Sequence, residues 1–181
     1  MIGPPPRIRL LLADHDRRIR ELRTKLLALL PEGDIEVVAQ AATGPQALAM
    51  AIAHRPDVVV ADLDLPGLDG IRVAEALGSL LPNSRAVLVT ARADATGLTG
   101  ALAAGVSAFL PKAVSVTELA AVVRAAPAGR CHVDPGLLGD AISTAGEAAL
   151  AGELGHPGTA LRAEPSVRDE TGMEKARSES F

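Results

Sequence analysis

The chain has 181 residues, which is enough for one ordinary domain plus an appendage, whereas a second full domain would be small. Apolar residues make up 48% of the chain, with two Phe and no Trp or Tyr, so an aliphatic core is expected. The single cysteine excludes an internal disulfide, and the net charge of −4 offers no general attraction for nucleic acid. No signal-peptide-like leader and no apolar run of about 20 residues is present, which predicts a cytoplasmic protein that does not enter the membrane.

The pattern of apolar residues predicts five strand–helix units in chain order. Strands are expected at about 7–13, 35–39, 58–61, 85–89 and 107–110. Helices are expected at about 16–30, after Thr43, and at about 69–80, 94–104 and 116–126. Strands that alternate with helices indicate an α/β fold with a parallel sheet and right-handed crossovers.

The first predicted helix has an apolar and a basic side. The residues expected on its buried face are Ile19, Leu22, Leu26, Leu29 and Leu30. The basic residues Arg17, Arg18, Arg20, Arg23 and Lys25 lie on and around the opposite face. We interpret them as a solvated helix surface.

Chemically active side chains follow four of the predicted strands. Asp14 comes after the first strand and Asp62 after the continuous β-branched run of the third. Thr90 follows the fourth strand, and Lys112 lies close after the fifth. A carboxylate, a hydroxyl and an ammonium group at the carboxyl edge of a parallel sheet, where such folds bind ligands, predict a functional site.

With these residues in this order, the chain resembles the CheY-like receiver domain of two-component response regulators, particularly the NarL/FixJ type. The resemblance implies a flavodoxin-like, doubly wound (βα)5 sheet in the order 2-1-3-4-5, in which Asp14 and Asp62 share one crevice. It also implies that Asp62 accepts a phosphoryl group, that Thr90 is the switch hydroxyl and that Lys112 contacts the phosphate. Phe109 falls at the aromatic switch position of the family, with plain core packing as an equal alternative.

The acidic residues after the first strand depart from the family pattern. The family has two adjacent carboxylates there, whereas ungapped alignment puts Asp14 on the first and His15 on the second, the usual metal ligand. Magnesium prefers oxygen ligands, so the resemblance implies a site of Asp14, Asp62 and the Asp64 backbone carbonyl that His15 weakens. Asp16 either turns into this site or, as we favour, caps the following helix. A transition metal on His15 is a remote alternative.

We predict that the receiver domain spans residues 7–126 and that the remaining segments flank it. Residues 1–6 are predicted to be a flexible leader and residues 127–138 a linker. A weak helix is predicted at about 136–151, so that residues 139–181 comprise most of this helix and a mostly disordered tail. This part lacks the helix-turn-helix output domain of NarL/FixJ-type regulators, so no direct DNA binding by the chain is expected.

The sequence is compatible with three functions. The first is a non-enzymatic receiver that a histidine kinase phosphorylates on Asp62 and that switches a protein-interaction surface in transcription regulation. The second is a phosphorylation-independent module that forms a homodimer or binds an output protein, because His15 disturbs the metal site. The third, a haloacid-dehalogenase-type phosphatase, shares the order Asp62, Thr90 and Lys112. That class, however, has its nucleophile on the first strand and an acidic pair after the lysine.

Overall fold

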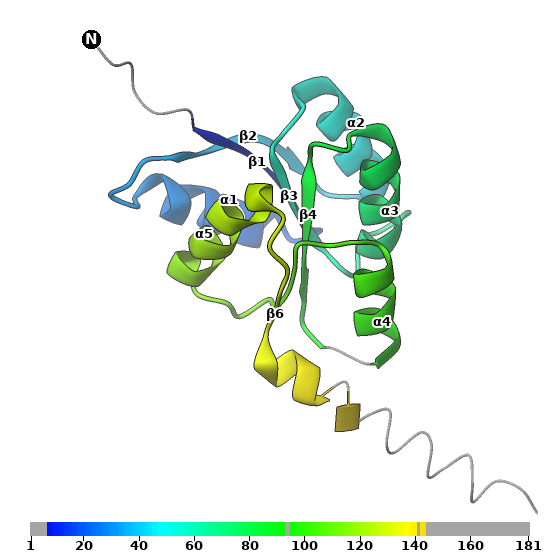
Figure 1. The fold of residues 1–181 in the computed structure, drawn as a ribbon. Helices are drawn as coiled ribbons and strands as arrows, with labels where there is room; N and C mark the ends of the chain where they lie inside the picture. The colour runs from blue at the N-terminus through cyan, green and yellow to red at the C-terminus, as the bar shows by residue number, and fades with distance from the viewer. Residues whose placement is uncertain (1–6, 93–94, 141, 144–181) are drawn as a thin grey trace, which may run out of the picture.

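A parallel β-sheet forms the centre of the fold (Figure 1). The computed structural model describes residues 7–92, 95–140 and 142–143. Its strands are β1 (Ile8–Ala13), β2 (Ile35–Ala41), β3 (Val58–Asp62), β4 (Arg85–Thr90), β5 (Ala108–Pro111) and β6 (His132–Val133). All neighbouring strands are parallel, in the order β2-β1-β3-β4-β5-β6. The predicted flavodoxin-like fold is confirmed, with one short strand added at the β5 edge.

Helices cover both faces of the sheet. They are α1 (Arg17–Ala28), α2 (Gly44–His54), α3 (Gly70–Leu80), α4 (Ala95–Ala103), α5 (Val116–Ala125) and the short 3-10 helix η1 (Ala126–Ala128). Figure 1 shows α1 and α5 on one face and α2, α3 and α4 on the other. Four of the helices begin at a capping side chain that accepts a backbone N–H: Asp16, Thr43, Asp69 and Ser115. Within the part of the chain that the structure describes, no helix has the length and apolar character needed to cross a bilayer.

The core is divided into two apolar layers by the alternation of side chains along the strands. Leu10 and Leu12 of β1 pack into the layer beneath α1 and α5. Leu11 of the same strand packs into the layer beneath α2, α3 and α4. Phe109 of β5 belongs to that second layer and is completely buried. A sheet covered on both faces explains why the strands read as continuous apolar runs.

The buried face of α1 differs from the one predicted. Leu22 and Leu29 are 56% and 78% exposed, whereas Arg23 and Leu27 are buried. The face that packs on the sheet contains Arg23 and Leu27, one helical turn apart. The sequence prediction was wrong here because it kept every basic side chain of the helix in water.

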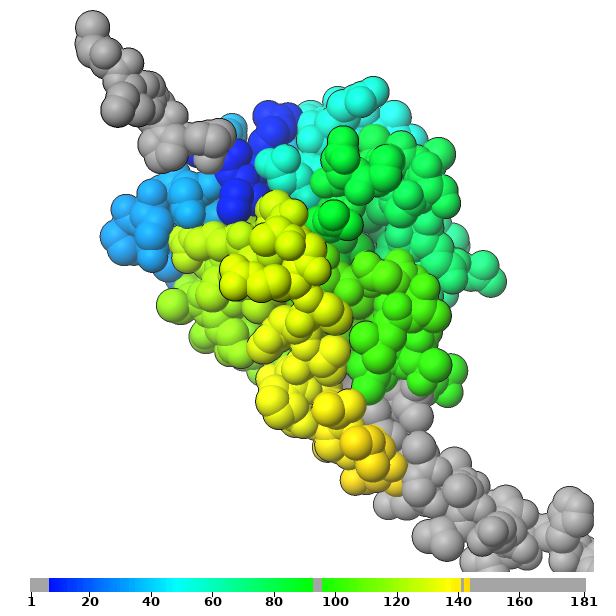
Figure 2. Space-filling view, in the orientation of Figure 1, coloured from blue at the N-terminus to red at the C-terminus, as the bar shows by residue number. Residues whose placement is uncertain are grey.

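The segment predicted as a linker packs against the domain. The N–H of His132 donates to Ser107 O at 2.9 Å and that of Asp134 to Phe109 O at 3.0 Å, which forms β6. Residues 135–140 are helical, and Leu137 is buried in the core. Figure 2 shows this yellow segment lying along the surface of the green elements. The predicted leader at residues 1–6 lies outside the described residues, as do residues 141 and 144–181 of the segment predicted as a weak helix and tail at 139–181.

Gly44 is a position where the loop after β3 approaches the start of α2 closely. A Cβ atom on Gly44 would lie 1.9 Å from the backbone oxygen of Leu68. We expect Gly44→Ala to destabilise the protein by about 1–3 kcal/mol, because the loop must move to relieve the overlap. Urea unfolding followed by far-UV circular dichroism measures the change. The control is Gly78→Ala, where nothing lies within 4 Å and a small gain in stability is expected. Equal effects of the two substitutions would contradict the close approach.

An ion pair between Arg124 and Asp34 ties α5 to the loop before β2. Arg124 Nε and Nη2 donate to the two carboxylate oxygens of Asp34 at 2.8 and 2.9 Å. This contact lowers the pKa of Asp34 and raises that of Arg124. A lowered folded-state pKa gives stability that is present above the unfolded pKa and is lost as the pH falls through the folded pKa.

We therefore expect Asp34→Asn to cost up to about 1 kcal/mol at neutral pH, because both side chains of the pair keep partial contact with water. The difference from the wild type should vanish once acid has protonated Asp34. Thermal unfolding at neutral and acidic pH measures it. A difference between the two proteins that persists in acid would contradict an electrostatic origin.

Candidate functional site

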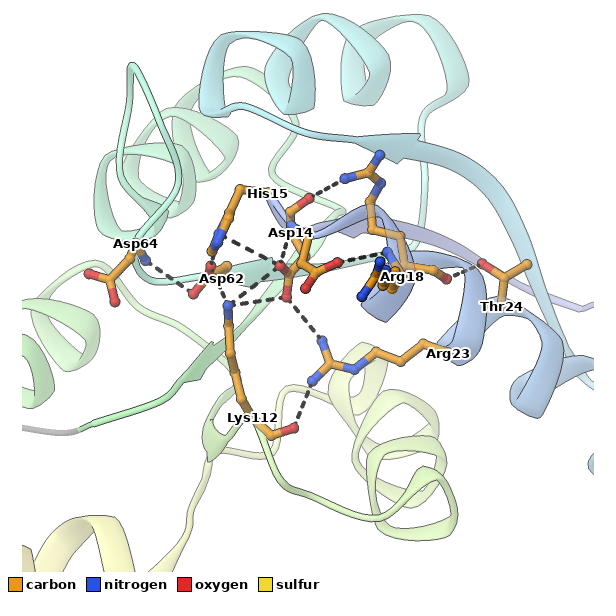
Figure 3. Close-up of polar contacts among 10 residues, drawn as sticks. Asp14, His15, Arg18, Arg23, Thr24, Asp62, Asp64 and Lys112 are labelled. Carbon is orange, nitrogen blue, oxygen red and sulfur yellow. Dashed lines mark hydrogen bonds and ion pairs between the residues drawn. The ribbon is translucent and has the colours of Figure 1, made fainter.

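Two carboxylates and an ammonium group meet at the carboxyl edge of the sheet. β1 and β3 are neighbours with Ala13 opposite Ala61, so Asp14 and Asp62, the next residues of each strand, come side by side. Lys112, which follows β5, donates from Nζ to Asp62 Oδ2 at 2.6 Å and lies 3.3 Å from Asp14 Oδ2 (Figure 3). Asp14 is 2% and Asp62 0% exposed, so both carboxylates depend on nearby cations and donors for compensation.

The reactive oxygens of Asp62 have defined partners. Its Oδ1 accepts the backbone N–H of Asp64 at 3.2 Å, and its Oδ2 accepts Lys112 Nζ. A glycine at position 70 keeps the site compact, because a Cβ atom there would lie 2.6 Å from the Asp62 backbone oxygen. The carboxylate is therefore fixed by the loop that follows its own strand.

His15 lies beside both carboxylates of the site. Its Nδ1 lies 3.1 Å from Asp62 Oδ2 and 3.8 Å from Asp14 Oδ1, and its side chain is 54% exposed. Asp14, His15 and Asp62 each offer one ligand atom, and these atoms lie within 4.8 Å of one another. Asp14 Oδ2 is buried without a hydrogen-bond partner, which leaves it available to a cation. The donor set can hold a metal, although an imidazole suits magnesium less well than a third oxygen.

Asp16 caps α1, as the sequence favoured. Its side chain accepts the Arg18 N–H at 2.8 Å, and its own N–H donates to Asp14 Oδ1 at 2.9 Å. The cap uses one carboxylate oxygen of Asp16 for the helix, and the backbone contact helps to orient Asp14. In this structure Asp16 supports the site from the helix and not as a member of the metal-ligating group.

Thr90 and Phe109 lie at or near the same edge, and the side chain of each packs or bonds elsewhere than on Asp62. The Thr90 side chain is buried, and its hydroxyl donates to Arg92 O and accepts the Arg92 N–H. The N–H of Lys112 donates to Thr90 O at 2.7 Å, which joins the ends of β4 and β5. Phe109 is completely buried in the core.

Two arginines that the sequence prediction assigned to the solvated face of α1 belong to the site instead. Arg23 is 9% exposed, with Nη1 3.7 Å from Asp14 Oδ2, and its Nη2 donates to Lys112 O at 3.1 Å. Arg20 Nη1 donates to Asp14 O at 2.5 Å. Burial lowers the pKa of Arg23, and attraction to Asp14 and Asp62 opposes this shift. The four-residue spacing of Ile19, Arg23 and Leu27 was the signal in the sequence that Arg23 faces inward.

Comparison with known proteins agrees with this geometry. The sequence pattern of the response regulator receiver domain matches residues 10–124. The protein named "Probable transcriptional regulatory protein NarL" of Mycobacterium tuberculosis is 34% identical over 135 residues, which cover 75% of this chain and 62% of that protein. The transcriptional activator DevR/DosR of the same organism is 32% identical over 127 residues, 70% of this chain and 58% of its own. The chain thus spans about three fifths of the length of these relatives.

Solved structures similar to this chain are also a receiver domain and a response regulator. The signal receiver domain of NarL from Mycobacterium tuberculosis is 33% identical with a TM-score of 0.66, covering 70% of this chain and 100% of that one. A LuxR-family two-component response regulator from Aurantimonas sp. SI85-9A1 is 28% identical with a TM-score of 0.68, covering 79% and 99%. With a match over residues 10–124, a parallel sheet in the expected order and the carboxylate–lysine cluster at its edge, the chain belongs to the response regulator receiver domain family.

Proposed function

We propose that this chain is a two-component receiver whose Asp62 accepts a phosphoryl group from a histidine kinase. The observation that supports this most directly is the contact of 2.6 Å between Lys112 Nζ and Asp62 Oδ2. A buried carboxylate held by an ammonium group has a partner ready for the negative charge that a phosphoryl group brings. The site therefore combines the nucleophile with a fixed positive charge.

In the proposed step, a carboxylate oxygen of Asp62 attacks phosphorus and forms an acyl phosphate. The bond between phosphorus and the donor atom breaks, and its electron pair leaves with the donor. Lys112 balances charge on the transferred oxygens. Thr90 is proposed to turn its hydroxyl from Arg92 O toward a phosphoryl oxygen. Phe109, which lies on the neighbouring strand β5 opposite Leu88, is proposed to respond as the aromatic switch residue.

Asp14 and Asp62, with the backbone carbonyl of Asp64, are the residues proposed to hold Mg²⁺. The ion would supply additional positive charge for the phosphoryl oxygens. His15 presents nitrogen where an oxygen ligand is preferred, so we expect weak magnesium binding. Asp14 Oδ2, which accepts no hydrogen bond and faces the cationic groups of Lys112 and Arg23, supports a cation at this place.

The output is proposed to run through protein contacts on the surface of α4, β5 and α5, either with an output protein or with a second copy of the chain. We also propose that the chain has a cytoplasmic, non-enzymatic role and does not bind DNA directly, in line with the expectation from its sequence. The receiver domain is proposed to span residues 7–126.

Incubation with acetyl phosphate and Mg²⁺, followed by intact-mass and tandem mass spectrometry, tests this function. We expect one added phosphate, located on Asp62 and labile to hydroxylamine, because acyl phosphates react with nitrogen nucleophiles. No uptake, or uptake only at another residue, would contradict the proposal.

One observation favours a second candidate function, the phosphorylation-independent binding module. His15 Nδ1 already contacts Asp62 Oδ2 at 3.1 Å, which places an imidazole where a metal or phosphate would act. In that case the oligomeric state or partner binding of the chain should be the same with and without the phosphodonor. The phosphatase alternative has no comparable support, because the matched family is the receiver domain.

A further inference from the structure

We infer that Arg23 is a built-in competitor of the divalent cation at Asp14, and that it keeps magnesium affinity low in this receiver. The inference rests on the proposed receiver site and concerns a residue outside the expected set of phosphoacceptor, hydroxyl and lysine. Figure 3 shows the Arg23 side chain reaching from α1 toward both Asp14 and Lys112.

Charge in the buried cluster is already balanced by the protein's own side chains. Asp14 and Asp62 are the two buried carboxylates, and Lys112 lies within 3.3 Å of the first and 2.6 Å of the second. Arg23 Nη1 lies 3.7 Å from Asp14 Oδ2 and provides the second positive charge. A metal ion that enters this cluster meets a site with no net negative charge, which removes much of its attraction.

Arg23 is held in place and cannot withdraw to water without loss. Its side chain is 10% exposed, and its Nη2 donates to Lys112 O at 3.1 Å. A buried guanidinium needs such partners, and its planar group keeps both contacts at once. Burial lowers the pKa of Arg23 while Asp14 and Asp62 oppose this, which agrees with a cation that both carboxylates stabilise.

The carboxylate oxygen of Asp14 that lies nearest to Arg23 is also the one that accepts no hydrogen bond. Asp14 Oδ2 has no hydrogen-bond partner, and its neighbours are the cationic groups of Arg23 and Lys112. The guanidinium therefore acts on the same atom that would ligate the ion. Removing it should leave Asp14 accessible and the cluster with one net negative charge.

The experiment is a magnesium titration of the wild-type chain and of Arg23→Leu. Calorimetry or NMR is required, because the chain has no Trp or Tyr for fluorescence. We expect Arg23→Leu to bind Mg²⁺ at least about tenfold more tightly, since a unit charge close to the ligand oxygen has been removed. The matched control is Arg18→Leu, which removes the same charge from an exposed position of the same helix and should change the affinity by less than about twofold.

A second variant separates charge from packing. Arg23→Gln keeps an N–H donor for the Lys112 carbonyl but lacks the charge, so it should also tighten magnesium binding. Unchanged or weaker binding in both variants overturns the inference, as does equal tightening in Arg18→Leu. Failure of both variants to fold would also overturn it, because Arg23 would then be a purely structural residue.

Phosphate uptake on Asp62 is measured on the same samples and reports on the proposed function separately. Tighter magnesium binding without any phosphate on Asp62 would support the role of Arg23 and contradict the phosphoacceptor role. Phosphate on Asp62 with unchanged magnesium affinity in the Arg23 variants would support the phosphoacceptor role and contradict the role of Arg23.

Discussion

Asp62→Asn is expected to abolish phosphate uptake from acetyl phosphate in the presence of Mg²⁺. An amide nitrogen and carbonyl cannot form the acyl phosphate, and the substitution also removes the negative charge that Lys112 Nζ contacts at 2.6 Å. Loss should be complete within the sensitivity of intact-mass spectrometry. The shape of the side chain is retained, so the variant should keep the far-UV circular dichroism of the wild type.

The matched control is Asp57→Asn. Asp57 precedes the same strand at its other end and accepts the Arg9 N–H at 2.8 Å, which an asparagine oxygen can also do. Phosphate uptake by Asp57→Asn should stay within about twofold of the wild type, because the substitution changes no residue of the site. Label that persists in Asp62→Asn, or label lost equally in both variants, would remove Asp62 from the mechanism.

Much of the site could be predicted because it lies at strand ends. The run of β-branched residues before Asp62 identifies a fully covered strand, and a covered parallel strand presents its last side chain at the ligand-binding edge. To predict that Asp14 and Asp62 are adjacent also required the order of the strands, which the family resemblance supplied. Pairing of Ala13 with Ala61 in the structure confirms it.

The errors have a physical cause in common, which is that tertiary contacts override local preference. Arg23 is buried because Asp14 Oδ2 and the Lys112 carbonyl lie 3.7 and 3.1 Å from its guanidinium nitrogens, and neither partner is visible from the helix alone. Likewise, β6 has only two residues, and it is held at the edge of the sheet by the backbone N–H groups of His132 and Asp134, which donate to Ser107 O and Phe109 O. No short apolar run in the sequence could have indicated it.

His15→Asp is expected to bind Mg²⁺ at least about tenfold more tightly than the wild type, because an oxygen ligand with a full negative charge replaces an imidazole. Its phosphate uptake should become faster in parallel, since the ion helps to neutralise the phosphoryl oxygens. Calorimetry or NMR gives the affinity, and mass spectrometry over time gives the rate. Equal magnesium affinities of the two proteins would contradict the view that the His15 nitrogen limits the site.

The control His15→Asn separates ligand type from charge. Its amide oxygen can ligate the ion without adding a charge, so an intermediate affinity is expected. His15 and Arg23 act on different oxygens, the former 3.1 Å from Asp62 Oδ2 and the latter 3.7 Å from Asp14 Oδ2. Both nevertheless belong to one charged cluster, with His15 Nδ1 also 3.8 Å from Asp14 Oδ1, so the double variant His15→Asp/Arg23→Leu should bind Mg²⁺ more tightly than either single variant without the two effects multiplying. A double variant no tighter than His15→Asp alone would mean that the new carboxylate already outweighs the guanidinium, leaving the imidazole as the main reason for weak binding.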